Sequence, residues 1–230
     1  MSLVQLERDG AVFVLRMAAG ENRLNGAMVA ALNEALDDVE ASQGEAALVT
    51  TGQGRFYSTG LDLEWLAQVD REEVQPFLVA LHGLFGRLLA FPVAAVAAIN
   101  GHAFAAGAML AFAQDFRVMR TGRGFVCLPE VDLATGGPLT PGMYALLGAK
   151  LTPAALHEAL VTGRRYPAEE ALARSLLHEA LPENEVLPRA VEIARGLAAK
   201  HRPTLAALKR GLYARALETL ERPATGVEIE

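Results

Sequence analysis

Two short stretches that each follow an apolar run decide the fold of this chain. Residues 52–62 read Gly-Gln-Gly-Arg-Phe-Tyr-Ser-Thr-Gly-Leu-Asp, and residues 100–107 read Asn-Gly-His-Ala-Phe-Ala-Ala-Gly. Each combines the end of a β-type run, a glycine-bearing turn and the expected start of a helix. Backbone N–H groups at a helix start lack intrahelical acceptors and lie at the positive end of the helix dipole. Two such donors that converge would hold an oxyanion, so the pair predicts a site for enolate chemistry.

The composition describes a globular chain with one large core. The sequence has 230 residues, of which 52% are hydrophobic and 21% are charged. A chain of this length buries enough apolar surface to form a single domain. The formal net charge is −6, and lysine occurs only at Lys150, Lys200 and Lys209. Because nothing here would neutralise a track of phosphates, we expect no nucleic-acid partner.

The sequence predicts neither a membrane span nor a targeting signal. Its most apolar run, residues 91–99, is too short to cross a bilayer. The N-terminal residues lack the apolar core of a signal peptide, and the terminal Val-Glu-Ile-Glu is not a peroxisomal signal. The single cysteine, Cys127, lies in an apolar stretch and is expected to be a buried, reduced thiol. These features favour a cytoplasmic protein without a membrane partner.

Apolar residues alternate between β-type and helical spacing along the first half of the chain. Asp9-Gly10 separates two short β-type runs, which predicts a hairpin. Repeated strand-then-helix order further on implies parallel strands with right-handed crossovers. Strands are expected at residues 3–7, 11–17, 46–51, 93–99 and 116–119, and helices at residues 26–41, at residues 71–90 and from about residue 107.

Beyond residue 137 the spacing becomes almost entirely helical. The last predicted helix has an apolar stripe that a compact monomer would leave partly exposed. Docking on the core of its own chain and contact with a second subunit both explain this stripe. The predicted helices cover residues 143–149, 153–161, 167–173, 185–200 and 203–220, and the stripe consists of Leu205, Leu208, Leu212, Ala216 and Leu220.

The two turns, in this order and at this separation, resemble those of the crotonase family, also known as the enoyl-CoA hydratase/isomerase superfamily. The Asn-Arg-Leu-Asn phrase at residues 22–25 and the segment at residues 151–181 strengthen the resemblance. It implies an α/β fold, in which a spiral of ββα turns (residues 1–184) precedes a C-terminal helical trimerisation region (residues 185–230). It also implies an acyl-CoA thioester as substrate, no metal, no cofactor other than the coenzyme A of that thioester, and a homotrimer or hexamer.

The resemblance also implies roles for particular residues. The backbone N–H groups of Leu61 and Ala106 would form the oxyanion hole. Family members usually carry consecutive glycines where this chain has Ala105-Ala106-Gly107, so we expect a slightly different backbone there. Taken alone, Gly60 and Gly107 are also explained as turn residues with positive φ, and Asp62 as a helix cap. The residues implied in binding the substrate are Arg23, Leu24, Ser58, Gly60, Asp62, Gly107 and Met109.

The acidic residues separate the possible reactions. Hydratases of this family use two glutamates to activate water, and the first of these positions is Met109 here. The second is Glu130, in a Pro-Glu phrase. One carboxylate beside an oxyanion hole suits a proton shift, in which Glu130 takes the α-proton of a 3-enoyl thioester and returns it at C4. In this respect the chain is similar to the short, plant-type Δ3,Δ2-enoyl-CoA isomerases of fatty acid β-oxidation.

Several alternatives stay open at this stage. The chain would also fit a hydratase, another acyl-CoA enzyme of the family, or a protein that binds acyl-CoA without chemistry. Dienoyl-CoA isomerases carry an aspartate eight residues after the glutamate, where this chain has Pro138. Asp132 would share a face with Glu130 if both lay on a strand. Lys209 and Arg210 are further candidates to contact the CoA 3′-phosphate.

Two other segments have competing explanations. Residues 63–77 are expected to cover the acyl chain as a flap, although surface packing explains Trp65 equally well. His102 lies inside the second turn but has no partners at metal-ligand spacing, so a packing role is the simpler expectation. Asp115 precedes a predicted strand and is expected to be structural.

Overall fold

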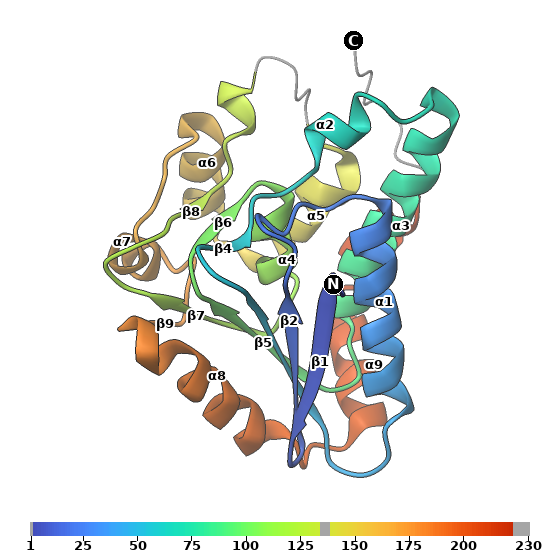
Figure 1. The fold of residues 1–230 in the computed structure, drawn as a ribbon, viewed down its shortest axis with the longest axis vertical. Helices are drawn as coiled ribbons and strands as arrows, with labels where there is room; N and C mark the ends of the chain where they lie inside the picture. The colour runs from blue at the N-terminus through green and yellow to red at the C-terminus, as the bar shows by residue number, and fades with distance from the viewer. Residues whose placement is uncertain (1, 134–138, 223–230) are drawn as a thin grey trace.

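A six-stranded sheet in the order β1-β2-β3-β5-β7-β9 forms the base of the molecule (Figure 1). The computed structural model describes residues 2–133 and 139–222. β1 pairs with β2 as the predicted hairpin, and all other neighbours in this sheet are parallel. The strands are β1 (Val4–Asp9), β2 (Val12–Met17), β3 (Ala47–Gly52), β5 (Ala94–Ile99), β7 (Phe116–Arg120) and β9 (Glu179–Leu181).

A second, three-stranded parallel sheet lies at the ends of the first. It consists of β4 (Phe56–Ser58), β6 (His102–Phe104) and β8 (Val126–Cys127), in that order. β4 and β6 directly follow β3 and β5, so each of these two repeats contributes one strand to each sheet before a helix begins, whereas the first repeat contributes both β1 and β2 to the large sheet. This arrangement confirms the expected spiral of ββα turns. The short strands and β9 were not predicted, because two or three residues are too few for a periodic pattern.

Helices cover both faces of the large sheet. On one face α8 (Glu183–Leu197) packs through Val186, Ala190 and Ala194 against small and β-branched strand residues. The other helices gather on the opposite face around the main core, and Figure 1 shows α8 apart from them. They are α1 (Gly26–Ala41), α2 (Leu63–Leu66), α3 (Arg71–Leu89), α4 (Ala106–Phe112), α5 (Pro141–Lys150), α6 (Pro153–Thr162) and α7 (Ala168–Ala173).

The last predicted helix is divided into α9 (Arg202–Leu212) and α10 (Ala214–Glu221). Tyr213, between them, leaves helical geometry with ψ of 16°, and its hydroxyl accepts a hydrogen bond from Lys150 Nζ at 3.1 Å. Of the apolar stripe, Ala216 and Leu220 are buried, whereas Leu208 and Leu212 are 66% and 74% exposed. Only the second half of the stripe therefore docks on its own chain. The trimer stays a prediction, as does a separate region over residues 185–230, whose last eight residues (223–230) lie outside the described part.

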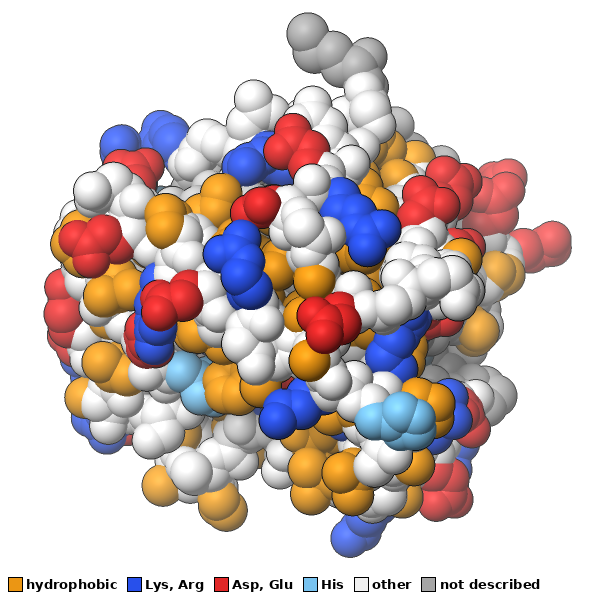
Figure 2. All heavy atoms as spheres, turned by 90° about the horizontal axis from the view of Figure 1, so that it is seen from below, with side chains coloured by type: hydrophobic (Ala, Val, Ile, Leu, Met, Phe, Trp, Pro, Cys, Tyr) orange, Lys and Arg blue, Asp and Glu red, His pale blue; other side chains and the backbone are white. Residues whose placement is uncertain are grey.

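No helix within the described residues combines the length and hydropathy that crossing a bilayer requires. On the face seen in Figure 2, acidic and basic side chains are interspersed rather than sorted by sign.

Lys209 is part of the core and not a surface contact for phosphate. Its ammonium group is 2.6 Å from Asp115 Oδ2 and donates to the carbonyl oxygens of Phe91 and Val93, each at 3.0 Å. Asp115 also accepts a hydrogen bond from the Ala95 amide at 2.8 Å, which confirms its structural role. This cluster fastens α9 to the start of β5. The candidate phosphate contact at Lys209 is therefore wrong.

Replacing Lys209 should destabilise the fold. Lys209→Ala leaves the Asp115 carboxylate, only 18% exposed, without its cation, and a broken buried ion pair costs about 3 kcal/mol or more. Urea denaturation would measure this loss. Exposed Lys200→Ala is the control, expected to change stability by less than about 0.5 kcal/mol. Equal stability of the two variants would contradict the assignment of Lys209 to the core.

Candidate active site

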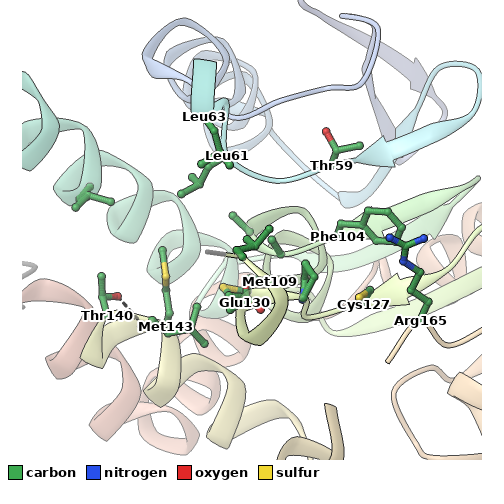
Figure 3. Close-up of a pocket in the computed structure, with 16 residues that line it drawn as sticks. Thr59, Leu61, Leu63, Phe104, Met109, Cys127, Glu130, Thr140, Met143 and Arg165 are labelled. Atoms are coloured by element: carbon green, nitrogen blue, oxygen red, sulfur yellow. Dashed lines mark hydrogen bonds between the residues drawn. The ribbon is translucent and has the colours of Figure 1, made fainter. Parts of the chain in front are cut away.

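A cavity of about 300 Å³ lies where the two predicted turns meet (Figure 3). The first turn contributes Thr59 and Leu61, and the second contributes the segment from Phe104 to Ala106. α2, α3 and α5 complete the wall with apolar side chains, among them Leu63, Leu78 and Met143. The predicted residues that line this cavity are Leu61, Ala106, Met109 and Glu130.

The two turns touch backbone to backbone. Gly60 has φ of +95°, and a Cβ atom there would lie 2.9 Å from the Phe104 carbonyl oxygen. A Cβ atom at Gly107 would lie 2.4 Å from the Ser58 carbonyl oxygen. Both glycines are therefore required, but for different reasons. Gly60 has the expected positive φ, whereas Gly107 does not and serves the close approach alone.

Hydrogen bonds fix the first turn to residues 22–24. The Ser58 hydroxyl donates to the Asn22 carbonyl at 2.7 Å and accepts from the Gly60 amide at 3.2 Å. The Leu24 amide donates to the Gly60 carbonyl at 2.7 Å, and the Leu24 carbonyl accepts from the Asp62 amide at 3.1 Å. The Leu61 amide, between these bonds, has no acceptor within the described residues.

The second turn places a free amide at the start of α4. Ala105 precedes the helix with φ of 49° and ψ of −126°, a conformation that suits glycine better than alanine. Its own amide donates to the Cys127 carbonyl at 3.0 Å. The next amide, that of Ala106, has no acceptor in the part of the chain that is described. Two unsatisfied N–H groups therefore belong to residues that line one cavity.

Glu130 is the only acidic residue among the described residues that line the cavity. It begins the 3-10 helix η1 (Glu130–Asp132), directly after β8 and Pro129. Its Oε2 atom is buried without a hydrogen-bond partner, and burial raises the pKa of the carboxyl above its ordinary value. Met109, one turn into α4, is 1% exposed and lines the same cavity. An unpaired carboxylate in apolar surroundings is a candidate base.

The remaining predicted binding residues lie behind or outside the cavity. Leu24, Ser58 and Gly107 are buried and hold the turns in place. Asp62 Oδ1 accepts from the Trp65 amide at 3.2 Å, which confirms the helix cap. Arg23 pairs with Glu21 at 2.8 Å and with Glu64 at 3.3 Å, away from the cavity. The roles of these residues in binding stay predictions.

Two expectations close to Glu130 need revision or cannot be followed. The condition under which Asp132 would share a face with Glu130 is not met, because both residues belong to the 3-10 helix η1 and not to a strand. Pro138 lies outside the described residues.

Trp65 packs against Phe77 with ring centroids 4.8 Å apart, in keeping with a packing role. The flap stays a prediction, with Leu63 lining the cavity.

Several residues of the cavity wall were not predicted from the sequence. Thr140 caps α5 and Met143 lies in its first turn, Arg165 follows α6, and Phe104 ends β6. Only Phe104 lay within a quoted motif. The Cys127 thiol is buried as expected, and burial raises its pKa to about 11, which leaves it protonated and inert. No group of three or more His, Cys, Asp or Glu side chains in the described ranges is arranged to hold a metal ion.

The backbone at Ala105 yields a stability prediction. Ala105→Gly removes a side chain from a positive-φ position, and the relief should exceed the entropic cost of glycine, for a net gain of about 1 kcal/mol. Ala108→Gly, inside α4 at an ordinary helical position, is the control and should lose stability. Urea unfolding curves measure both. Loss of stability in Ala105→Gly would show that the turn is not strained.

Comparison with known proteins agrees with this geometry. The family model for enoyl-CoA hydratase/isomerase matches residues 7–227. The peroxisomal enoyl-CoA delta isomerase 2 of Arabidopsis thaliana is 30% identical over 220 residues, 90% of this chain and 91% of that protein. A putative enoyl-CoA hydratase of Thermus thermophilus is 34% identical over 232 residues, 98% of this chain and 87% of that protein.

A solved structure has a sequence identity to this chain like that of the two relatives above. The Mycobacterium tuberculosis protein described as an enoyl-CoA isomerase superimposes with a TM-score of 0.86 at 31% identity, over 95% of this chain and 94% of that one. The shared fold, the near-complete coverage and the match to the family model together assign the chain to the enoyl-CoA hydratase/isomerase family.

Proposed function

We propose that this chain converts 3-enoyl-CoA thioesters into 2-enoyl-CoA thioesters with Glu130 as the single proton carrier. The observation that carries the proposal is the acid content of the cavity. Among the described residues of its wall, Glu130 is the only acid, and Met109, which the family resemblance aligns with the other hydratase glutamate, lines the same cavity. A thioether neither orients nor deprotonates a water molecule. One carboxylate is sufficient for a proton shift.

The proposed reaction moves one proton and one double bond. Glu130 removes a proton from C2, and the electron pair passes into the thioester to form a dienolate. The amides of Leu61 and Ala106 donate to the enolate oxygen as its charge develops. Glu130 then returns the proton to C4, which leaves the double bond between C2 and C3. The sequence of steps is redox-neutral, so it needs no redox cofactor.

The apolar surroundings of Glu130 suit this task. Burial raises the pKa of its carboxyl, and a base with a higher pKa removes a weakly acidic C–H proton more readily. Met109, Leu63 and Met143 line the same space and limit the access of water. The dienolate is thereby protected from side reactions with solvent.

The names of the relatives include both reactions, so they do not separate the isomerase from the hydratase. The Arabidopsis relative carries an isomerase name and the Thermus relative a putative hydratase name, at similar identity. Side-chain chemistry favours the isomerase, because hydration by this family requires two carboxylates to hold a water.

Glu130→Gln should separate binding from turnover. The amide keeps the size of the side chain but cannot accept the proton from C2, so isomerisation should fall by about a hundredfold or more. Affinity for the substrate should remain near that of the wild type, since the turns and the cavity are unchanged. The assay follows 3-enoyl-CoA conversion spectroscopically, with calorimetry for binding. Wild-type turnover by the variant, or efficient hydration of 2-enoyl-CoA by the wild type alone, would overturn the proposal.

The pKa of Glu130 also predicts a pH dependence. Because burial raises this pKa above 4.5, kcat/KM should fall on acidification at a higher pH than for an ordinary glutamate. The same shift means that the folded state prefers protonated Glu130. Its stabilising contribution is therefore complete at low pH and is lost as the pH rises through the folded pKa. Urea unfolding should show Glu130→Gln gaining stability over the wild type between about pH 4 and about pH 7. An equal difference at both pH values would contradict the assigned shift.

A further inference from the structure

Lys150 is a half-buried lysine without an acidic partner among the described residues. It is the last residue of α5, and its Nζ atom lies 3.1 Å from the Tyr213 hydroxyl oxygen and 4.9 Å from the centroid of the same ring. No carboxylate in the described part of the chain comes within ion-pair distance of Nζ. Asp115 already lies 2.6 Å from the Lys209 ammonium. The Lys150 ammonium therefore lacks the charge compensation that Lys209 has.

The charged groups that act on Lys150 are mainly cationic. Arg117 on β7 and Lys209 on α9 carry positive charges, and Asp115 opposes them. His178, just before β9, is neutral at pH 7, because burial, Arg117 and Lys150 lower its pKa to about 4. Burial and the cations together lower the pKa of Lys150 to about 8.

A lysine in this environment is a nucleophile at mildly alkaline pH. At about pH 8, about half of the Lys150 side chains are neutral amines, against less than about 1% for an ordinary lysine. Only the neutral amine has a lone pair that attacks a carbonyl carbon. The Tyr213 hydroxyl next to it stays a neutral phenol, because burial raises its pKa.

The end of α5 leaves Lys150 open to reagents from solution. Gly148 and Ala149, which precede it, are exposed, and a Cβ atom at Gly148 would meet nothing within 4 Å. Lys150 does not line the active-site cavity. A compound that reaches its amine therefore comes from solvent and not through the cavity.

We propose that Lys150 is an acylation site, whose amine accepts the acyl group of a short-chain acyl-CoA thioester. The Nζ lone pair attacks the thioester carbonyl carbon, and the C–N bond forms while the C–S bond breaks. CoA leaves as a thiolate and takes up the proton that the nitrogen releases. The product is an amide that keeps one N–H for the Tyr213 hydroxyl and no longer repels Arg117. The thioester serves here only as an acyl donor, so the modification is independent of Glu130 and of isomerisation.

Acetyl-CoA tests this proposal, because it has no double bond to isomerise. The folded protein is incubated with acetyl-CoA at about pH 8, and peptide mass spectrometry follows acetylation of Lys150, Lys200 and Lys209, the three lysines of the chain. Lys150 should react at least about tenfold faster than exposed Lys200, since its large neutral fraction outweighs its partial burial. Lys209, 5% exposed and bound to Asp115, should stay unmodified. Equal or faster acetylation of Lys200 would overturn the proposal.

Two further measurements connect the reactivity to the folded environment. In concentrated urea the three lysines lose their surroundings and should react at equal rates, whereas a persistent preference for Lys150 would contradict the structural explanation. In the folded protein, the rate at Lys150 should level off above about pH 8, while an ordinary lysine continues to gain reactivity up to about pH 10. A parallel rise of Lys150 and Lys200 up to that pH would also count against the proposal.

Lys150→Arg provides the matched variant. The guanidinium group keeps a positive charge and a donor for Tyr213 but does not react as an amine nucleophile. Intact-mass spectrometry should show that this variant loses the fast phase of acetyl incorporation seen in the wild type. An unchanged fast phase would show that a different group accepts the acyl chain and would overturn the assignment to Lys150.

Discussion

Direct contact between two backbone turns is the constraint on which the site depends. At Gly60 and Gly107 there is no room for a Cβ atom, because carbonyl oxygens of the facing turn lie 2.9 Å and 2.4 Å from where it would be. Without this approach the Leu61 and Ala106 amides would belong to separate surfaces. The small sheet provides the approach, because β4 and β6 pair in parallel and end at the same edge. The free amides are therefore a consequence of strand pairing and two missing side chains.

The ionisable groups buried in this chain differ in whether they have a partner of opposite charge. Lys209 Nζ and Asp115 Oδ2 lie 2.6 Å apart. The Lys209 ammonium also donates to two backbone carbonyls, and the Asp115 carboxylate also accepts from one backbone amide. Glu130 is buried without a cation, and its Oε2 atom has no partner in the described structure. The first arrangement stabilises α9 against β5, whereas the second costs stability at neutral pH and leaves a basic carboxylate. An acid whose carboxylate oxygen is buried without a partner is a feature of functional sites.

Sequence patterns predicted the parts of the fold that have a long period or a strong steric signal. The first five strands of the large sheet, the helices and the meeting of the two turns belong to this class. Short strands such as β8 escaped prediction, since only two residues carry the pairing. The helix break at Tyr213 was not predicted either, and the hydroxyl of this residue accepts a hydrogen bond from Lys150, far away in sequence. Arg165 lines the cavity because the chain after α6 returns to the small sheet, where Tyr166 pairs with Val126 of β8, and no local pattern encodes that.

Met109 and Ala105 show how two departures from the family pattern act on one turn. Ala105 has a backbone conformation that suits glycine, so the backbone is strained with alanine at this position. The Ala106 amide still begins α4. Met109 lies one helical turn further on and removes a negative charge from beside Glu130. Two carboxylates in a cavity of about 300 Å³ would repel each other, and one would take up a proton. With methionine there, desolvation alone raises the pKa of Glu130, and the carboxylate does not compete with a neighbour for its proton. In the proposed isomerisation, Glu130 therefore moves the proton without a second acid beside it.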